Sequence, residues 1–401
     1  MLQRLTARAL ALSLVALPLF AQPLTATADS VAGRLFGLGP SEILTIDPAT
    51  GTTAKLADLP QVNVFPGAFF NNLASDAAGH HLFTSRTYYG EDFTPHYQIV
   101  TVDTTSATTS LSGDMPSGVT FLLYDRSSAS LFGQTNMCCP FQLVRIDPAN
   151  GAQTHVADIP GIQPLGMAAA PDRHALYFPT EDFDPNTFQP IVTIVTVNTS
   201  TGALTQSPPI AKGIVGLVYD TISQNLLGKT FCCPASLVSV NPSTGAETTI
   251  ADGLPIGPGL AIDSAAHTVY MADDELGAFD FFQLVISVND QTGAVTTSTG
   301  ELPRDMYVNS LAFESVVVTV AAVIHDVNTA LTSGGISNRG VGASLLAELN
   351  AASAAASGGQ CTAATGLMQA FINEVKAQTD NAISPETATK LIADAQSVTC
   401  P

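Results

Sequence analysis

The sequence predicts an all-β six-bladed propeller, made of three copies of a two-blade unit and followed by a small α-helical domain. Three observations support this prediction. A motif containing Leu-Ala-x-Asp, Leu-Phe, Leu-Val-x-Val-Asp and Pro-x-Thr-Gly returns six times, its loops alternate between two kinds, and the composition becomes helix-like after residue 314. Repeats of about 40 to 50 residues with four strands each are typical of propellers.

The first 28 residues predict an export signal. Arg4 and Arg8 provide a positive start, residues 9–20 form an apolar run too short to span a bilayer, and residues 26–28 form a small-residue cleavage site. We therefore expect a mature chain that begins at Asp29 and a protein that is secreted, periplasmic or on the cell surface.

The repeats align on the acidic position that ends the first strand, at intervals of 43 to 51 residues. Each repeat predicts four strands, A to D, with a Pro- and Gly-containing turn between C and D. The first repeat lacks strand A and the last offers a spare one. We therefore expect residues 308–313 to close blade 1, which gives a propeller over 29–314 without an open edge. The aligned positions are Asp29, Asp76, Asp125, Ala170, Asp220, Asp263 and Glu314.

The C–D turns at 47–51, 147–151 and 241–245 share the pattern Asp/Asn-Pro-x-x-Gly. These turns resemble those of YVTN-type and TolB-like propellers, and the resemblance covers 29–314. It implies the architecture and says little about activity, because this fold supports many functions.

The loops between strands B and C alternate along the chain. Blades 3 and 5 carry Cys-Cys-Pro, whereas blades 2, 4 and 6 carry longer acidic loops. B–C and D–A loops emerge on one face of a propeller, so we expect a binding surface there. The candidate residues of this surface are Glu91, Asp92, Glu181, Asp273, Asp274 and Glu275.

Six cysteines in an exported protein indicate oxidation. We expect vicinal disulfides Cys138–Cys139 and Cys232–Cys233, which are strained because neighbouring Cα atoms lie only about 3.8 Å apart. Such a ring either stiffens its loop or offers a rigid platform for a ligand. A cross-link over blade 4 is the alternative, and the spacing disfavours a four-cysteine metal site. Cys361 and Cys400 stand at adjacent ends of two predicted antiparallel helices, which favours a disulfide between them.

Asp182, Asp184 and Asn186 match the opening of a calcium-binding loop, and Ca²⁺ is the one cofactor that the sequence suggests. Thr187 and Thr193 stand where such a loop requires Gly and an acid. A solvated acidic face is therefore the alternative interpretation.

His80, His174 and His267 occupy the same A–B turn in blades 2, 4 and 6. Three histidines can hold zinc. Alternate blades of a six-bladed ring point about 120° apart, however, so we expect turn residues that do not converge.

No catalytic residues are predicted, because the sequence lacks the motifs G-x-S-x-G, H-E-x-x-H and the P-loop. Gluconolactonase-like propellers hold a metal with Glu, Asn and Asp at the channel mouth. Here the polar candidates are only Asn72, Asn309 and Ser310. The corresponding positions in the other blades are Phe121, Gly166, Gly216 and Gly259.

Residues 315–401 predict a helical region. Residues 316–331 form either an apolar helix or a strand-to-helix linker, and helices follow at 341–356, 362–378 and 385–398. Ser384 and Pro385 provide an N-cap and a first helical residue. The motifs at 345–349, 371–375, 383–385 and 391–395 resemble the FIMAH module of secreted bacterial proteins, and the resemblance covers 318–400. It implies export and no catalytic residues.

The net charge of −20, with only 14 unclustered Lys and Arg residues, argues against nucleic-acid and anionic-membrane partners. We expect a secreted, monomeric, non-catalytic binding protein that recognises a glycan, a peptide or a surface partner through the B–C/D–A face. The alternative is a secreted metal-assisted hydrolase or lactonase that holds Ca²⁺ at this face.

Overall fold

The computed structural model describes residues 33–62, 67–135, 140–161, 163–184, 186–230, 234–255, 259–276, 281–303, 307–315, 320–358 and 360–398. The predicted export signal lies outside these residues, as do Cys138, Cys139, Cys232, Cys233 and Cys400. Cys361 is described only as the first residue of a helix. The disulfide pairings therefore stay predictions.

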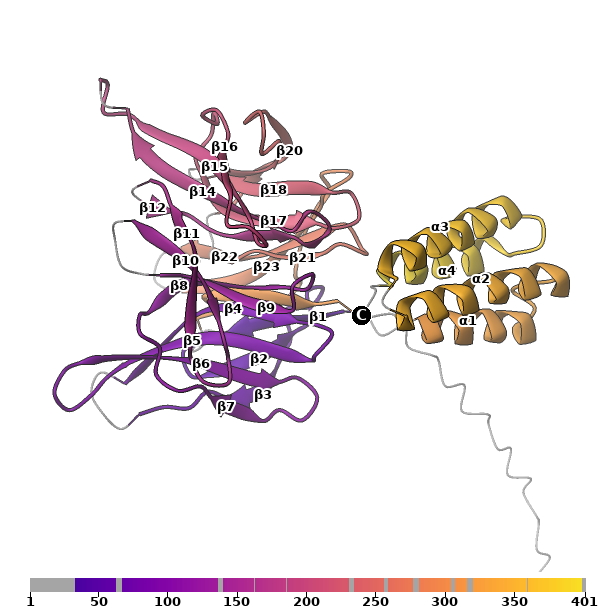
Figure 1. Cartoon of the computed structure of the whole chain (residues 1–401), viewed down its shortest axis with the longest axis horizontal. Coiled ribbons are helices and arrows are strands. Elements are labelled where there is room, and N and C mark those ends of the chain that lie inside the picture. Colours follow the sequence, from indigo (N-terminus) through magenta and orange to yellow (C-terminus); the bar gives the residue numbers. More distant parts are fainter. Residues whose placement is uncertain are drawn as a thin grey trace, which may run out of the picture. The chain divides into compact units, whose positions relative to one another are not determined.

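Six antiparallel sheets form the blades, which confirms the predicted fold class (Figure 1). The odd-numbered blades have medium-length strands throughout. Blade 1 is β25 (Ser310–Glu314), β1 (Arg34–Leu38), β2 (Glu42–Ile46) and β3 (Thr53–Asp58). Blade 3 is β8 (Val119–Asp125), β9 (Ser130–Thr135), β10 (Phe141–Ile146) and β11 (Gln153–Ile159). Blade 5 is β17 (Ile214–Asp220), β18 (Asn225–Thr230), β19 (Ala235–Val240) and β20 (Glu247–Leu254).

The even-numbered blades have long second and third strands and a short fourth strand. Blade 2 is β4 (Ala68–Asp76), β5 (His81–Tyr89), β6 (Pro95–Asp103) and β7 (Thr109–Leu111). Blade 4 is β12 (Gln163–Pro164) and β13 (Ala168–Ala170), then β14 (Ala175–Phe183), β15 (Pro190–Asn198) and β16 (Leu204–Gln206). Blade 6 is β21 (Ala261–Asp263), β22 (Thr268–Leu276), β23 (Phe281–Asn289) and β24 (Val295–Thr297).

Strand length alternates from blade to blade. Strands B and C have 9 residues in each even blade, against 5 or 6 in the odd blades. Strand D has 3 residues in each even blade and 6 to 8 in the odd blades. This alternation is that of a two-blade unit used three times.

The last strand of the sheet region pairs with the first. β25 runs antiparallel to β1, with Leu35 opposite Phe313 and Leu38 opposite Ser310. Blade 1 is therefore assembled from both ends of the propeller sequence. This pairing satisfies a strand edge that would otherwise expose backbone hydrogen-bonding groups.

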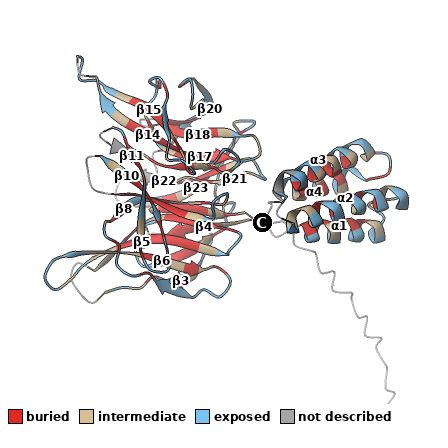
Figure 2. Cartoon of the chain, in the orientation of Figure 1, coloured by how far each residue is buried: buried red, intermediate tan, exposed pale blue. Residues whose placement is uncertain are grey.

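The core lies between neighbouring blades (Figure 2). One cluster joins Phe36 and Leu38 of blade 1 to Leu82 and Val100 of blade 2, and all four side chains are fully buried. Burial of each such side chain contributes about 1.5–3 kcal/mol. The apolar faces of the sheets thus fix how adjacent blades pack.

The C-terminal region has four helices: α1 (Val320–Ser333), α2 (Arg339–Ser357), α3 (Cys361–Gln378) and α4 (Pro385–Ser397). Ser384 caps α4 by accepting the Thr387 amide at 3.3 Å. Buried Leu345, Phe371 and Leu391 share one core, as their helical spacing predicts. In the described part of the chain, no helix is long and apolar enough to cross a membrane.

Candidate functional site

The B–C hairpins of blades 2 and 4 extend well beyond the short fourth strands of their sheets. β5 and β6 pair over nine positions, from His81 opposite Asp103 to Tyr89 opposite Pro95. β14 and β15 pair equally far, ending with Phe183 opposite Pro190. Strand D is short in these blades, so the outer halves of the hairpins project without a fourth strand (Figure 1).

The predicted acidic loops are partly strands. Glu181 and Asp182 lie in β14, opposite Val192 and Ile191. Asp273, Asp274 and Glu275 lie in β22, in a ladder with β23 that sequence reasoning placed in a loop. The expectation of loop positions is wrong for these residues. The strands extend over acidic positions with low β propensity, and four of the five acids stand opposite an apolar residue in the ladder.

Glu91 and Asp92 do lie in a turn, between β5 and β6. Asp92 Oδ1 accepts the Thr94 hydroxyl at 2.7 Å and the Thr94 amide at 3.1 Å. These bonds lower the pKa of Asp92, with the hydroxyl contributing most. The carboxylate therefore serves to fix the turn.

The candidate calcium ligands are placed by a turn of the same kind. Asp184 Oδ1 accepts the amides of Asn186 and Thr187 at 2.7 and 3.2 Å, and these bonds lower the pKa of Asp184. Asp182 Oδ1 accepts the Phe183 amide at 2.8 Å. The Asp-x-Asp-x-Asn pattern thus builds the hairpin tip, which gives its residue types a local structural reason. Calcium binding there stays a prediction.

Each of these two hairpins presents a phenylalanine at its tip. Phe93 is 80% exposed with a φ of 63°, and Phe188 is 77% exposed with a φ of 54°. Each donates its amide back across the turn, Phe93 to the Gly90 carbonyl at 3.0 Å and Phe188 to the Asp184 carbonyl at 2.8 Å. The corresponding tip of blade 6, residues 277–280, lies outside the described residues.

A bulky side chain in the left-handed region is strained, and neither ring recovers the cost by burial. Sequence reasoning selected the acids of this surface and missed both aromatic residues. The signal that could have revealed Phe93 is its position directly after two acids in a turn bounded by Gly90 and Thr94.

Side chains just below the tip of the β5–β6 hairpin form a stacked array. The rings of Tyr88 and His96 stack at 4.9 Å, and the Arg86 guanidinium lies 4.7 Å from the centre of the Tyr88 ring. His96 Nδ1 lies 2.7 Å from Asp114 Oδ2. Burial lowers the pKa of Arg86, whose Nη1 donates to Gln98 at 3.0 Å. These contacts hold the hairpin in one orientation.

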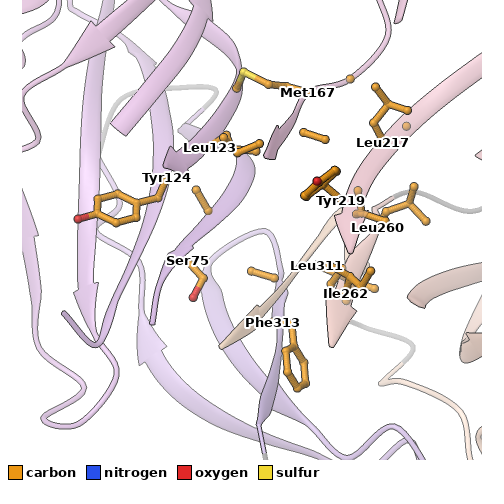
Figure 3. A pocket seen from close by; sticks show the side chains of 18 of the residues that line it. Ser75, Leu123, Tyr124, Met167, Leu217, Tyr219, Leu260, Ile262, Leu311 and Phe313 are labelled. Carbon is orange, nitrogen blue, oxygen red and sulfur yellow. The ribbon is translucent and has the colours of Figure 1, made fainter. Parts of the chain in front are cut away.

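A cavity of about 590 Å³ follows the propeller axis and is lined by the first strands of all six blades. Most of the labelled side chains in it are apolar, including Leu123, Met167, Leu217 and Leu260 (Figure 3). The cavity can admit a small apolar molecule, and its lining favours no particular chemistry.

The polar residues predicted at the channel mouth do line this cavity, and they bond the first strands to one another. Asn72 Nδ2 donates to the Thr120 carbonyl, and Asn309 Nδ2 donates to the Phe70 carbonyl at 3.4 Å. Ser310 Oγ accepts the Leu73 amide at 3.1 Å. Phe121, Gly166, Gly216 and Gly259 occupy the corresponding positions in the other blades.

The three repeated histidines are turn residues, with φ values of 55°, 49° and 50° at His80, His174 and His267. Their Nδ1 atoms contact three different side chains: Glu314 at 2.9 Å, Ser127 at 3.2 Å and Asp220 at 2.9 Å. Each histidine thus lies at a different interface between an odd blade and the next even blade, and we call each of these three interfaces a seam.

Comparison with known proteins finds similarities for both parts of the chain, the helical region and the propeller. Residues 320–399 match the model of the FIMAH domain family. No curated protein matches the sequence. A structure of the nidogen/laminin complex contains a similar propeller, with a TM-score of 0.54 at 13% identity over 71% of this chain and 99% of that one.

TolB from Acinetobacter baumannii is similar at a TM-score of 0.51 and 11% identity, over 70% of this chain and 66% of that chain. Likenesses at such low identity establish the fold alone. The chain is a six-bladed β-propeller that carries a FIMAH domain at its C-terminus.

Proposed function

We propose that the protein is an extracytoplasmic binding protein whose even-blade hairpins contact a protein partner. The observation that carries this proposal is the pair of exposed phenylalanines, Phe93 and Phe188, held in the left-handed region at equivalent hairpin tips. Strained backbone is kept at positions where it serves function, and exposed aromatic side chains are frequent anchors of protein interfaces.

The surroundings of the tips favour a protein partner of mixed character. Glu91 and Asp92 precede Phe93, and Asp182 and Asp184 lie within a few residues of Phe188 along the hairpin. An apolar anchor with an acidic rim is complementary to an apolar pocket flanked by Lys or Arg. The stacked side chains just below the tip of the β5–β6 hairpin reduce the entropy lost when the tip is bound.

Two further observations support this assignment. The similar propeller is part of the nidogen/laminin complex. The first 28 residues have the composition of an export signal, which would deliver the protein outside the cytoplasm.

The test is an interaction screen of purified wild-type chain against an array of extracellular proteins and glycans, laminin among them. The double variant F93S/F188S removes both anchors. L204S is the matched control, because Leu204 is an exposed apolar residue (41%) in the outer strand β16.

We expect an array protein that binds wild type and L204S alike and binds F93S/F188S at least about 10-fold more weakly. Binding that F93S/F188S retains in full would contradict the proposal, as would binding confined to glycans or the absence of any bound protein.

A further inference from the structure

The three seams that follow odd blades share one arrangement. The acid-bearing end of an odd blade's first strand faces a histidine in the A–B turn of the next blade. In each of these even blades, the residue after strand C donates its backbone amide to the carbonyl of the histidine. The pairs are Thr104 with His80 at 2.8 Å, Thr199 with His174 at 2.8 Å, and Asp290 with His267 at 2.9 Å. Two of these residues are threonines, and the third is an aspartate.

Two of the seams balance their buried carboxylate with protein groups. Glu314 meets Arg34 Nη2 at 2.6 Å and the Thr104 hydroxyl at 3.1 Å. Asp125 accepts the hydroxyls of Ser127 and Ser128, the latter at 2.7 Å. Each seam therefore satisfies its acid without a further ligand.

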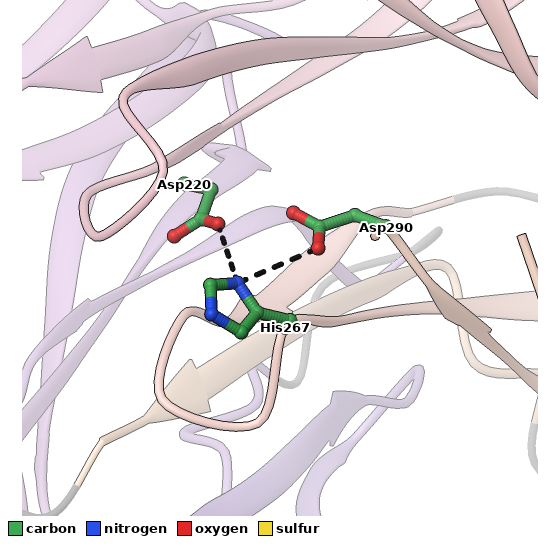
Figure 4. Close-up of side chains that lie close together, drawn as sticks. All are labelled: Asp220, His267 and Asp290. Carbon is green, nitrogen blue, oxygen red and sulfur yellow. Dashed lines mark hydrogen bonds and ion pairs between the residues drawn. The ribbon is translucent and has the colours of Figure 1, made fainter. Parts of the chain in front are cut away.

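The seam between blades 5 and 6 has two buried carboxylates. The side chains of Asp220 and Asp290 are both 0% exposed. His267 Nδ1 lies 2.9 Å from Asp220 Oδ2 and 3.5 Å from Asp290 Oδ1 (Figure 4). Among the described residues, neither carboxylate is paired with a Lys or Arg side chain.

One oxygen of this cluster is unsatisfied. Within the described part of the chain, Asp290 Oδ2 has no hydrogen-bond partner, and Figure 4 shows it on the side of Asp220. Burial, with the facing Asp220 carboxyl, raises the pKa of Asp290. Burial also acts on Asp220, but the bonds from the Ser223 hydroxyl and the Ile222 amide outweigh it and lower the pKa of Asp220.

We propose that Asp220, His267 and Asp290 bind a divalent transition-metal ion, with Zn²⁺ the best match. One ligand atom from each residue lies within 4.8 Å of the others. In a tetrahedral zinc site with bonds of about 2.0–2.2 Å, ligand atoms are about 3.4 Å apart, close to the distances around His267 Nδ1. An imidazole nitrogen with two carboxylates favours zinc over calcium or magnesium, which prefer all-oxygen sites.

A metal bound at this site would cross-link blade 5 to blade 6. Asp220 ends β17 of blade 5, whereas His267 and Asp290 belong to blade 6. Bonds from Ser223 at 2.6 Å and Ile222 at 2.9 Å orient the Asp220 carboxylate, as such partners do around metal ligands. The His267 side chain is 30% exposed, so solvent reaches one ligand of the cluster.

The test uses the purified full chain, stripped with EDTA and titrated with ZnCl₂ by calorimetry, with metal content measured after dialysis. D290T is the decisive variant, because threonine occupies the same position in the other two seams. H267N is a second one, because asparagine tolerates the left-handed conformation of position 267. D58N, at an exposed acid of β3, is the control.

We expect one Zn²⁺ per chain in wild type and D58N, and a melting temperature that zinc raises. Binding should be at least about 100-fold weaker in D290T and H267N. If D290T fails to fold, H267N alone decides the outcome. Wild type that binds no stoichiometric zinc would overturn the site, and so would variants that bind zinc as tightly as wild type.

Discussion

His80 Nδ1 lies 2.9 Å from Glu314 Oε1, so a turn residue of blade 2 contacts the acid that ends the strand closing blade 1. Arg34, the first residue of β1, donates to the other oxygen of the same carboxylate at 2.6 Å. The Thr104 hydroxyl adds a third bond at 3.1 Å. Glu314 therefore joins both ends of the propeller sequence to the second blade.

Replacement of this acid should weaken ring closure. In E314Q, the buried side chain (6% exposed) loses its charge and leaves the Arg34 bond without its anionic acceptor. We expect the free energy of unfolding to fall by about 1–3 kcal/mol, as measured by urea denaturation. E91Q changes an exposed turn acid and should leave the midpoint unchanged. Equal stability of E314Q and wild type would show that this contact does not close the ring.

The hairpin tips should become more stable when their aromatic residues are removed. Phe93 adopts a φ of 63° while 80% exposed, so F93N relieves backbone strain and forfeits little burial. We expect a gain of about 1 kcal/mol in the free energy of unfolding. L204N removes an exposed apolar side chain from a strand and should give no gain. A loss of stability in F93N would mean that the ring packs in the folded state.

Matched substitutions in the C–D turns should have opposite signs. Gly151 in blade 3 has a φ of 77°, and a Cβ there would overlap the Gly113 carbonyl oxygen of blade 2. Ala107 holds the corresponding turn position in blade 2, is exposed and has a φ of 59°. In thermal or urea unfolding, G151A should lose about 1–3 kcal/mol and A107G should gain up to about 1 kcal/mol. Changes of the same sign would refute this account of the turns.

The loss of folding stability at acid pH should depend on Asp103. Its carboxylate accepts the Thr105 hydroxyl at 2.7 Å and the Ser106 amide at 2.7 Å. The hydroxyl bond is the largest cause that lowers the pKa of Asp103 from 3.8. A lowered pKa in the folded state adds stability that is fully present above the unfolded-state value and is lost as the pH falls toward the folded-state value.

D103N should therefore be less stable than wild type near neutral pH, and the difference should shrink as the pH falls below about 4. Urea denaturation of both proteins between pH 7 and pH 2.5 checks this prediction. A difference that is independent of pH would show that the carboxylate charge does not matter to the turn.

The fold could be predicted because local sequence encodes much of it. The Pro and Gly of each C–D turn and the alternation of loop types predicted blades in pairs. The alternating strand lengths, 9 residues in β5 and β14 against 6 in β9 and β18, are the structural form of that alternation. The segment 362–378, predicted to be a helix, likewise lies in α3, where Phe371 is buried in the core of the helical region.

Neither the two hairpin tips nor the cluster of Asp220, His267 and Asp290 could be predicted from the sequence, for physical reasons. The positive φ at Phe93 and Phe188 depends on the geometry of each turn, and phenylalanine is not a residue type that indicates such a conformation. Asp220 and His267 are 47 positions apart and meet only because neighbouring blades pack. The repeated histidines are turn residues that do not converge, as expected, but the contact of each with an acid or a hydroxyl of the adjacent blade depends on blade packing.

Hydrogen exchange of the wild-type chain, alone and with a protein captured in the array, tests the binding proposal most directly. We predict slower exchange over residues 89–95 and 183–190, which include the two hairpin tips, and unchanged exchange at the C–D turns around Gly51 and Gly151. Protection confined to the C–D turns or to the helices α1–α4, with both tips exchanging as in the free chain, would contradict the account.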